Sequence, residues 1–378
     1  MERKNLLEKV RSKYILKILL NPLSRMKLIN LSFYNKKLRK FNDIKVDEYK
    51  QESLKIIIVI FPLEKQSGKF INIRKGNESH FKIYFNNSKK EINTQKITKK
   101  DYVYKIKVII NPKNNAFYGL FNGCKIIKKI KFIRFNRTDI KNMNLMFYGC
   151  SELKELDLSH FRTDKVNTMF RMFGYCTSLK KLNLSKFNTI KVKDMNNMFE
   201  NCSALEELNL SSFNTFNVES MSSMFSRCTS LKKLDLSNFN TKSVKSMDFM
   251  FYDCSSLEEL IISNFNTENV ISMSNMFYKC SSLKQLNISN FNTKNVEDMG
   301  FLFEDCYSLL ELDISNFNTN NVKNAFLMFG NCCNLKKLNI SNFNINRDAF
   351  IDRMFENCSS LKDIICSNEF KSRLRFLD

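Results

Sequence analysis

Ten of the twelve cysteines recur at a constant spacing of 26 residues, and thiols are versatile groups that can bind metals, form disulfides or act as nucleophiles. Metal sites usually use close pairs such as C-x-x-C, whereas each of these cysteines stands alone with no row of histidines beside it. Thiols on neighbouring units should also lie too far apart to bond to each other. We therefore predict a column of buried free thiols, without metal or disulfide, formed by Cys124, Cys150, Cys176, Cys202, Cys228, Cys254, Cys280, Cys306, Cys332 and Cys358.

Other catalytic groups are scarce. The chain has two histidines, and His160 occupies a repeat position that is filled by Lys186 and Ser212 in the next units, so we interpret it as a surface variant. We find no nucleophile elbow, phosphate-binding glycine loop or zinc-protease motif. Eight glycines in the whole chain leave little material for such loops. The sequence predicts a protein that is not an enzyme and needs no cofactor.

The elements that must position the thiols repeat with the same period, and a fixed period of this size indicates a solenoid. The first half of each unit alternates apolar and polar residues, as Leu234, Asp235 and Leu236 do, which predicts a short strand. In the second half, apolar residues follow at steps of three, three, one and three. That spacing places them on one face of a predicted helix; in one unit they are Val244, Met247, Met250, Phe251 and Cys254.

The strand half has the pattern L-x-x-L-x-L, the leucine-rich-repeat signature. The full unit, C-x-S-L-K-x-L-x-L-S-x-F-N-T-x-x-V-x-x-M-x-x-M-F-x-x-C, resembles the 26-residue repeat of bacterial surface proteins, which also occurs in many protist proteins. This resemblance covers residues 116–366. It implies an α/β leucine-rich-repeat solenoid with short parallel strands on the concave face and helices on the convex face. Ordinary repeats carry an asparagine where this chain has Phe161 and its successors, so we expect an aromatic spine instead of an asparagine ladder.

Four regions follow from this pattern. Residues 1–50 form a helical segment and residues 51–110 a small β-rich cap, so the solenoid has an N-terminal cap region of helices and strands. Residues 111–366 make up the solenoid of about ten 26-residue units, and residues 367–378 form a C-terminal cap. Counting back by the period also suggests that the stretch YVYKIKVII before residue 111 is a degenerate first turn.

The polar residues between the alternating leucines should line the concave sheet, the surface on which such solenoids usually bind partners. We predict partner contacts there by Asp157, Asn183, Asn209, Asp235, Asn287, Asp313 and Asn339.

Charged residues on neighbouring units alternate in sign along a second row, which includes Lys181, Glu207, Lys233 and Glu259. Opposite charges on adjacent strands contribute roughly 0.2–1 kcal/mol each, so one interpretation is a device that holds the turns in register. The other is a recognition stripe, and these four residues are candidate partner contacts on that interpretation. In the adjoining row of Lys180, Glu206, Lys232, Glu258 and Lys284, the apolar residue Leu310 interrupts the pattern.

The formal net charge of +23 is confined to the front of the chain. Residues 1–141 hold 35 Lys and Arg against 11 Asp and Glu, whereas residues 142–378 hold 26 against 27. Aromatic residues are interleaved with lysine at the front, but in no recognisable nucleic-acid module. A bias toward Lys, Asn and Ile is also what an AT-rich genome produces. Nucleic acid and anionic membrane are therefore disfavoured as partners.

Residues 1–50 contain apolar positions at helical spacing, broken by Pro22. They resemble an F-box, a helical module that docks on the ubiquitin-ligase adaptor Skp, although the usual opening Leu-Pro is absent. The resemblance implies contacts with a Skp-type adaptor; a plain helical cap is the alternative. The contact residues would be Ile15, Leu16, Leu19, Leu23 and Leu28.

No apolar run reaches membrane-spanning length, and the N-terminus lacks a clear cleavage site, so we expect no signal peptide and a cytoplasmic location. The predicted function is a non-catalytic scaffold that binds a protein partner on the solenoid. An F-box-type substrate adaptor and a surface adhesin are the alternatives.

Overall fold

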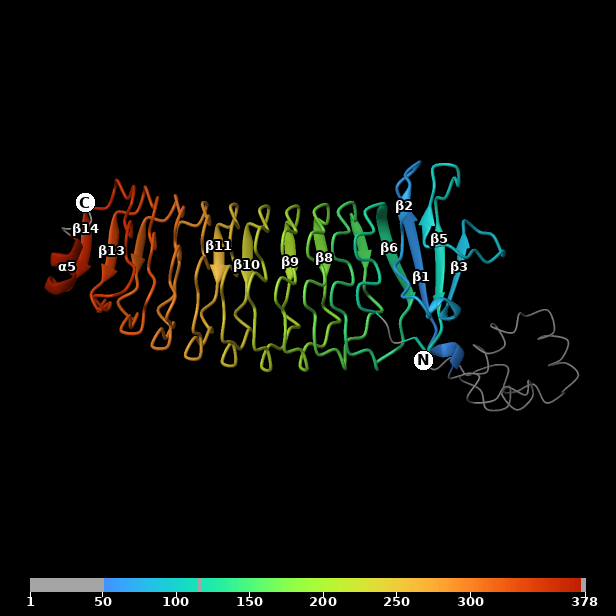
Figure 1. The fold of residues 1–378 in the computed structure, drawn as a ribbon, viewed down its shortest axis with the longest axis horizontal. Helices are drawn as coiled ribbons and strands as arrows, with labels where there is room; N and C mark the ends of the chain where they lie inside the picture. Colours follow the sequence, from blue (N-terminus) through green and yellow to red (C-terminus); the bar gives the residue numbers. More distant parts are fainter. Residues whose placement is uncertain (1–50, 115–116, 375–378) are drawn as a thin grey trace, which may run out of the picture.

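The computed structural model describes residues 51–114 and 117–374, and in it the repeats stack as the turns of one long solenoid (Figure 1). The strands at the N-terminal end are β1 (Ile56–Pro62), β2 (Gly68–Lys69), β3 (Phe81–Phe85), β4 (Lys96–Ile97) and β5 (Ile106–Ile110), with the short 3-10 helix η2 (Glu78–His80). The strands of the solenoid are β6 (Ile127–Arg134), β7 (Glu155–Asp157), β8 (Lys181–Asn183), β9 (Glu207–Asn209), β10 (Lys233–Asp235), β11 (Glu259–Ile261), β12 (Glu311–Asp313), β13 (Lys337–Ile340) and β14 (Asp363–Cys366). The helix α5 (Asn368–Leu374) follows the last strand.

A five-stranded sheet joins the N-terminal strands to the solenoid, in the order β3-β5-β1-β6-β7. Strand β1 lies between β5 and β6 and is antiparallel to both, and β7 continues parallel to β6. Five of the seven residues of β1 are buried, which explains its run of isoleucine and valine, because a central strand covered by neighbours favours β-branched residues.

The predicted degenerate first turn in YVYKIKVII is wrong. Strand β5 within this stretch pairs antiparallel with β1 and β3, whereas the strands of the solenoid pair in parallel. The solenoid column begins with β6, where Ile130 lies opposite Leu156. Alternating apolar residues predict a strand but not the direction of its neighbour, so counting by the period placed β5 in the wrong element.

Asn72 covers the free backbone edge of the first solenoid turn. Its N–H donates to the carbonyl of Leu120 at 2.7 Å, and its side-chain amide donates to the carbonyls of Gly119 at 3.2 Å and Asn122 at 2.5 Å. In later turns, the carbonyls at the equivalent positions accept hydrogen bonds from backbone N–H groups of the preceding turn. The carbonyl of Asn144, for example, accepts the N–H of Gly119 at 2.9 Å. The N-terminal region thus supplies donors where a preceding turn would have supplied them.

The strands of the solenoid are parallel and aligned with a shift of one repeat. Leu182 lies opposite Leu208, and Leu234 lies opposite Leu260, with their side chains turned into the core. The strand ladder is continuous in groups: β8 pairs with β9, β10 with β11, and β12 with β13 and β14. Figure 1 shows these strands following one another along one side of the stack.

The helices that we expected on the convex face are absent from the solenoid turns in the described residues, so the prediction of an α/β fold with convex helices is wrong. Val244, Met247, Met250, Phe251 and Cys254 are fully buried, as the spacing predicts. The segment that carries them consists of successive tight turns and single parallel bridges rather than a helix. The bridges link Asn142, Thr168, Asp194, Ser220, Ser246, Ser272, Asp298, Asn324 and Phe350 in order.

Backbone conformation and hydrogen bonding explain this difference. Phe249 and Asp253 have φ of 56° and 53°, and single left-handed residues interrupt a right-handed helix. The N–H of Met250 donates to the carbonyl of Met247 at 3.2 Å, which closes a tight turn, whereas the N–H of Phe251 donates to Met276 on the next turn at 2.9 Å. The same three-residue steps arise in a helix and in a chain of such turns, so periodicity could not separate them.

Two columns of phenylalanine run through the core, and the predicted aromatic spine is confirmed. Phe251 stacks on Phe277 with ring centroids 5.6 Å apart and planes inclined by 12°. In the second column, Phe213 stacks on Phe239 at 6.4 Å with planes inclined by 3°.

A buried threonine ladder runs beside the second column. The hydroxyl of Thr241 donates to the carbonyl of Asn266 at 2.8 Å and accepts the N–H of the same residue at 2.7 Å. Because one hydroxyl satisfies both backbone groups of the next turn, a fully buried polar side chain is tolerated here. Its members are Thr163, Thr189, Thr215, Thr241, Thr267, Thr293 and Thr319.

At the C-terminal end, α5 packs against the last turns (Figure 1). Phe370 of α5 is buried and contacts Phe343, the last ring of the second phenylalanine column, edge to face at 5.9 Å.

Candidate functional site

The polar row that we expected to contact a partner lies on the strand side of the solenoid. Asp157, Asn183, Asn209, Asp235, Asn287 and Asp313 are exposed, and Asn339 is half-buried. Each side chain also has a local role, because its oxygen accepts the N–H of the serine two residues later; the distance is 2.9 Å for Asp235 and Ser237. Such turns end the strand, so this residue type is explained without a ligand.

The charged row forms ion pairs between hydrogen-bonded strands. Lys181 Nζ lies 2.5 Å from Glu207 Oε1 across β8 and β9, and Lys233 Nζ lies 2.7 Å from Glu259 Oε2 across β10 and β11. Within the described ranges, no ion pair joins Glu207 to Lys233, so each pair forms on one side only. These exposed pairs contribute about 0.2–1 kcal/mol each, which favours the interpretation that they hold strands in register.

A hollow of about 630 Å³ opens on this strand face where the ladder is interrupted. Residues 285–287 form no strand, although β11 precedes them and β12 follows them by one turn each. Leu260, Leu286 and Leu310 line the hollow, and Leu310 is 41% exposed. A polar rim surrounds these leucines: Glu258, Glu259, Lys284, Gln285, Asn287 and Glu311.

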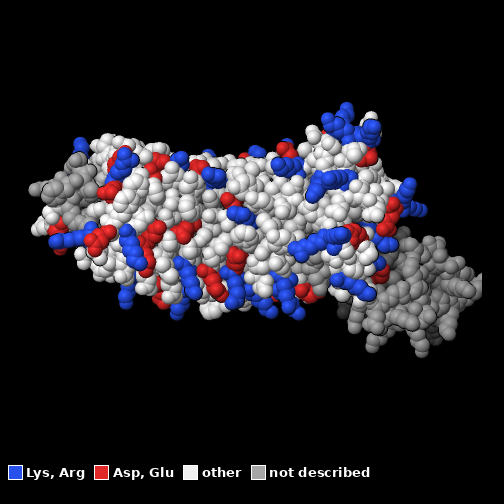
Figure 2. All heavy atoms as spheres, in the orientation of Figure 1, with Lys and Arg blue, Asp and Glu red and all other residues white. Residues whose placement is uncertain are grey.

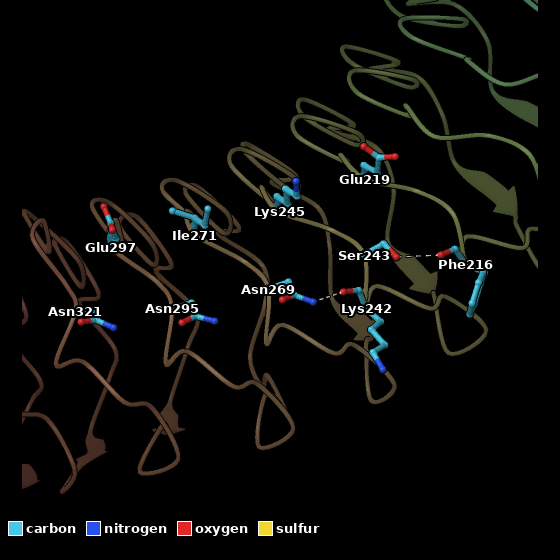
Figure 3. A pocket seen from close by; sticks show the side chains of 10 residues that line it. All are labelled: Phe216, Glu219, Lys242, Ser243, Lys245, Asn269, Ile271, Asn295, Glu297 and Asn321. Carbon is cyan, nitrogen blue, oxygen red and sulfur yellow. Dashed lines mark hydrogen bonds between the residues drawn. The ribbon is translucent and has the colours of Figure 1, made fainter.

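A second, larger groove of about 1110 Å³ runs across several turns at a different part of the repeat. Figure 3 shows its side chains in three rows that follow the direction of stacking. One rim carries Phe216 and Lys242. The floor row is Ser243, Asn269, Asn295 and Asn321, and the other rim is Glu219, Lys245, Ile271 and Glu297.

The floor of this groove is a ladder of side-chain amides. Asn269 Nδ2 donates to the carbonyl of Lys242 at 2.8 Å, and Asn295 Nδ2 donates to that of Glu268 at 2.6 Å. At the turn of Ser243 a hydroxyl replaces the amide and reaches the carbonyl of Phe216 at 3.3 Å; Figure 3 draws this bond and that of Asn269 as dashed lines.

The predicted burial of the cysteine column is confirmed for nine of its ten members, and Cys358 at the C-terminal end is half-buried. From Cys150 onward, each thiol of the column donates to a phenylalanine carbonyl of the preceding turn, as Cys254 does to Phe225 at 3.2 Å. Burial raises the pKa of Cys254 to about 12, so the reactive thiolate is disfavoured at neutral pH. This environment suits an apolar structural residue and not a nucleophile.

Other titratable groups add no reactive constellation. Burial, reinforced by the neighbouring Asp305, raises the pKa of Glu304 to about 7, but the adjacent Asp305 is occupied by the hydroxyl of Tyr307 at 2.9 Å and the amide of Asn331 at 2.8 Å. His160 is exposed, and its ring nitrogen lies 3.1 Å from Ser159 Oγ. In residues 51–114 and 117–374, no group of three or more His, Cys, Asp or Glu side chains is placed to hold a metal ion.

Lysine and arginine gather around the N-terminal strands, whereas both signs of charge alternate along the solenoid (Figure 2). The predicted F-box contacts Ile15, Leu16, Leu19, Leu23 and Leu28 lie outside the described residues. Among the residues that are described, no helix is long and apolar enough to span a bilayer.

Sequence reasoning missed the groove of Figure 3 and the threonine ladder. The threonines recur with the 26-residue period, which could have indicated a buried ladder. We had instead explained their recurrence by a turn-forming role of the stretch S-N-F-N-T. The groove residues are variable at exposed turn positions, and their only signal was that Phe216 and Ile271 stand where most other units have polar residues.

The model of the family described as "Mycoplasma protein of unknown function, DUF285" matches residues 114–233, 180–261 and 256–368. No protein in the curated set matches the chain.

Solved structures with similarity include a leucine rich cell surface protein from Faecalibacterium prausnitzii A2-165, with 16% identity over 62% of this chain and 78% of that chain and a TM-score of 0.22. Another is a leucine-rich repeat protein from Eubacterium ventriosum ATCC 27560, with 17% identity over 60% of this chain and 70% of that chain and a TM-score of 0.30. The stacked 26-residue turns with inward leucines make this chain a leucine-rich-repeat-like solenoid, as predicted.

Proposed function

The chain belongs to the DUF285 family, and from this premise we propose that it is a non-catalytic scaffold that binds a protein partner on the strand face of its solenoid. The observation that carries the proposal is the hollow at the interrupted ladder. Leu310 is exposed at its edge, Leu260 and Leu286 lie beneath, and charged and amide side chains surround them. An apolar centre within a polar rim is the arrangement typical of protein interfaces.

The repeat itself supports a functional interpretation of Leu310. The equivalent positions on the neighbouring turns are Lys284 and Lys336, so a lysine fits the backbone there. Leu310 keeps 41% of its surface in water, so the fold leaves much of this apolar side chain uncovered. Together with Leu260 and Leu286 it forms an apolar group inside a polar rim, and such a group supports a contact with another molecule.

A photocrosslinking side chain at position 310 tests this proposal. We expect it to capture one defined protein in cells, whereas the same group at Arg227, which is exposed on the methionine and cysteine segment, should not capture that protein. Leu310→Lys should abolish the capture by a crosslinker placed at Gln285 without lowering the melting temperature. Equal capture from positions 310 and 227 would contradict binding at the hollow.

We propose a cytoplasmic site for this interaction, which fits a chain with twelve free cysteines, because such thiols persist in reducing compartments. Location of a tagged protein inside or outside intact cells tests it, and exposure on the cell surface would favour the adhesin alternative. The adaptor alternative requires capture of a Skp-type protein by residues 1–50.

A further inference from the structure

The groove of Figure 3 departs from the regular repeat at one turn. Ser243 stands in the floor row where Asn217 and Asn269 stand on the two adjacent turns. Serine is shorter than asparagine, and its hydroxyl makes a longer contact, 3.3 Å to the carbonyl of Phe216, than the 2.8 Å contact of the Asn269 amide. The floor is therefore lowest at the turn of Ser243.

Two exposed apolar side chains stand beside this low point. Phe216 lies one turn before Ser243 on one rim and is 58% exposed, and Ile271 lies one turn after it on the other rim and is 49% exposed. The corresponding rows hold polar residues such as Asn320 and Glu297 on other turns, although the turn before Phe216 has Ile190, so neither position needs an apolar residue for folding. Single exposed apolar residues are ordinary, but two that face one groove indicate a binding surface.

Two lysines at the centre of the groove stand outside the ion pairs of its rim. On the rim that holds Lys245 and Ile271, Glu219 pairs with Lys193 at 2.9 Å, and Glu297 pairs with Lys323 at 2.7 Å. Lys242 and Lys245, on the turn of Ser243, make no ion pair within the part of the chain that the structure describes, although the charge of Lys245 acts on Glu219 beside the hydrogen bond from Lys193. Two ammonium groups thus lie between two apolar side chains, in a segment of the protein whose charges otherwise balance.

We propose that this groove binds an extended segment of a partner protein in which two apolar side chains, three residues apart, flank two acidic side chains. Phe216 and Ile271 are two turns apart, or about 10 Å at ~4.8 Å per turn, and three residues of extended chain span about the same length at ~3.3 Å each. The carboxylates meet Lys242 and Lys245. The amide of Asn269, which donates one N–H to the preceding turn, presents its oxygen to an N–H group of the segment.

A labelled peptide with the core leucine-aspartate-glutamate-leucine between glycines tests the proposal by fluorescence anisotropy with the full chain. Three variants copy a residue that another turn already has at the same position or reverse one charge: Phe216→Asn, Ser243→Asn and Lys242→Glu. We expect each to weaken binding about tenfold or more, the loss typical of a central interface contact. Lys294→Glu is the matched control, because Lys294 stands in the same row as Lys242 but does not line the groove, and it should leave the affinity within about twofold.

Thermal melting of every variant separates lost binding from lost folding, and all four substitutions are at exposed positions. Peptides with lysines in place of the acids, or glycines in place of the leucines, should not bind. Failure of the acidic peptide to bind at millimolar concentration would overturn the proposal. So would equal binding of a single-stranded oligonucleotide, because that would reduce the site to a patch of positive charge.

Discussion

The thiol of Cys254 donates a hydrogen bond to the backbone carbonyl of Phe225 over 3.2 Å, and this contact recurs along the cysteine column. Cys228 donates to Phe199 at 3.3 Å and Cys280 to Phe251 at 3.3 Å. The carbonyl belongs to the phenylalanine of the preceding turn, so each thiol links two turns. The column therefore acts as a set of small buried groups that also satisfy backbone acceptors.

Stability should fall at alkaline pH because of these thiols. Burial raises the pKa of Cys254 and Cys202 to about 12, above the ordinary value of about 8.5. Below pH ~8.5 the thiols are protonated in both states, and above it the unfolded chain releases protons that the folded chain retains until about pH 12. The free energy of unfolding should therefore decrease as pH rises through this range, as urea titrations followed by circular dichroism would show.

The double variant Cys228→Ala and Cys254→Ala is the control for this prediction. It lacks two of the raised pKa values but keeps every lysine and tyrosine that also titrates at high pH. Its loss of stability between pH 8 and pH 10 should be smaller than that of the unchanged protein. Identical losses would show that the thiols do not drive the alkaline effect.

The repeat positions made much of the core predictable. Leu234, Phe251 and Cys254 are buried, as their recurrence predicted. An apolar residue that recurs at the same position of every turn stacks on its equivalents in the neighbouring turns, and this stacking forms the core. The path of the backbone was not predictable in the same way. The left-handed conformation of Phe249 has no clear residue signature, since this position also holds Leu, Arg, Asn or Ser in other turns. The position of Asp253 did carry a signal, because most other turns have Gly, Asn or Asp there, and these residues favour the left-handed region.

The two candidate binding surfaces could be predicted from the sequence only in part. The exposed Leu310 was visible as an exception to a charged row, whereas the interruption of the ladder at residues 285–287 was not. Binding surfaces arise where individual turns deviate from the repeat, and only the stacking shows which deviations meet in space. Phe216, Ser243 and Ile271 lie on three successive turns, two of them on opposite rims of the groove and one on its floor. Only the structure shows that these three residues line the same groove.

Removing one hydroxyl from the threonine ladder should be costly. Thr241→Val leaves the N–H and the carbonyl of Asn266 without the partner that serves both, so we expect a loss of about 1–3 kcal/mol. Chemical denaturation measures it. Thr241→Ser keeps the hydroxyl and should lose clearly less; a valine variant as stable as the serine variant would show that the hydroxyl is dispensable.

Reversing the charges of one turn tests whether the charged row holds the strands together. Replacing Glu206 and Glu207 with lysine removes the ion pairs to Lys180 at 2.8 Å and Lys181 at 2.5 Å and adds repulsion. The melting temperature should fall at low salt and recover in part at high salt, because salt screens exposed charges.

Exchanging the charges on both turns is the matched control. Lysine at positions 206 and 207 combined with glutamate at 180 and 181 restores opposite charges and should restore stability at low salt. If the first variant melts like the unchanged protein but loses its partner, the row is a recognition stripe.

The last prediction concerns the polarity of the solenoid and the residue that completes its first turn. In the methionine and cysteine segment, backbone N–H groups donate to the following turn, as Phe121 does to Met146 at 2.9 Å. The first turn consequently presents carbonyls at its free edge, and a cap must bring donors to them. Asn72 brings its N–H and its side-chain amide to three carbonyls, those of Gly119, Leu120 and Asn122.

Asn72→Asp should therefore destabilise the protein more than Asn72→Ala, although aspartate matches asparagine in shape. A carboxylate at this position faces the carbonyl oxygens of Gly119 and Asn122 and repels them, whereas alanine only removes the amide that donates to them and keeps the backbone N–H that donates to Leu120. The same repulsion should raise the pKa of the introduced carboxyl, so its protonated form, which can donate, is favoured in the folded state. The stability difference between the two variants should shrink as pH falls from 7 toward 4, because a group with a raised folded pKa stabilises only below it. Urea titrations of both variants across this range measure the difference, and an aspartate variant that is as stable as the asparagine protein at pH 7 would show that the first turn does not depend on these donors.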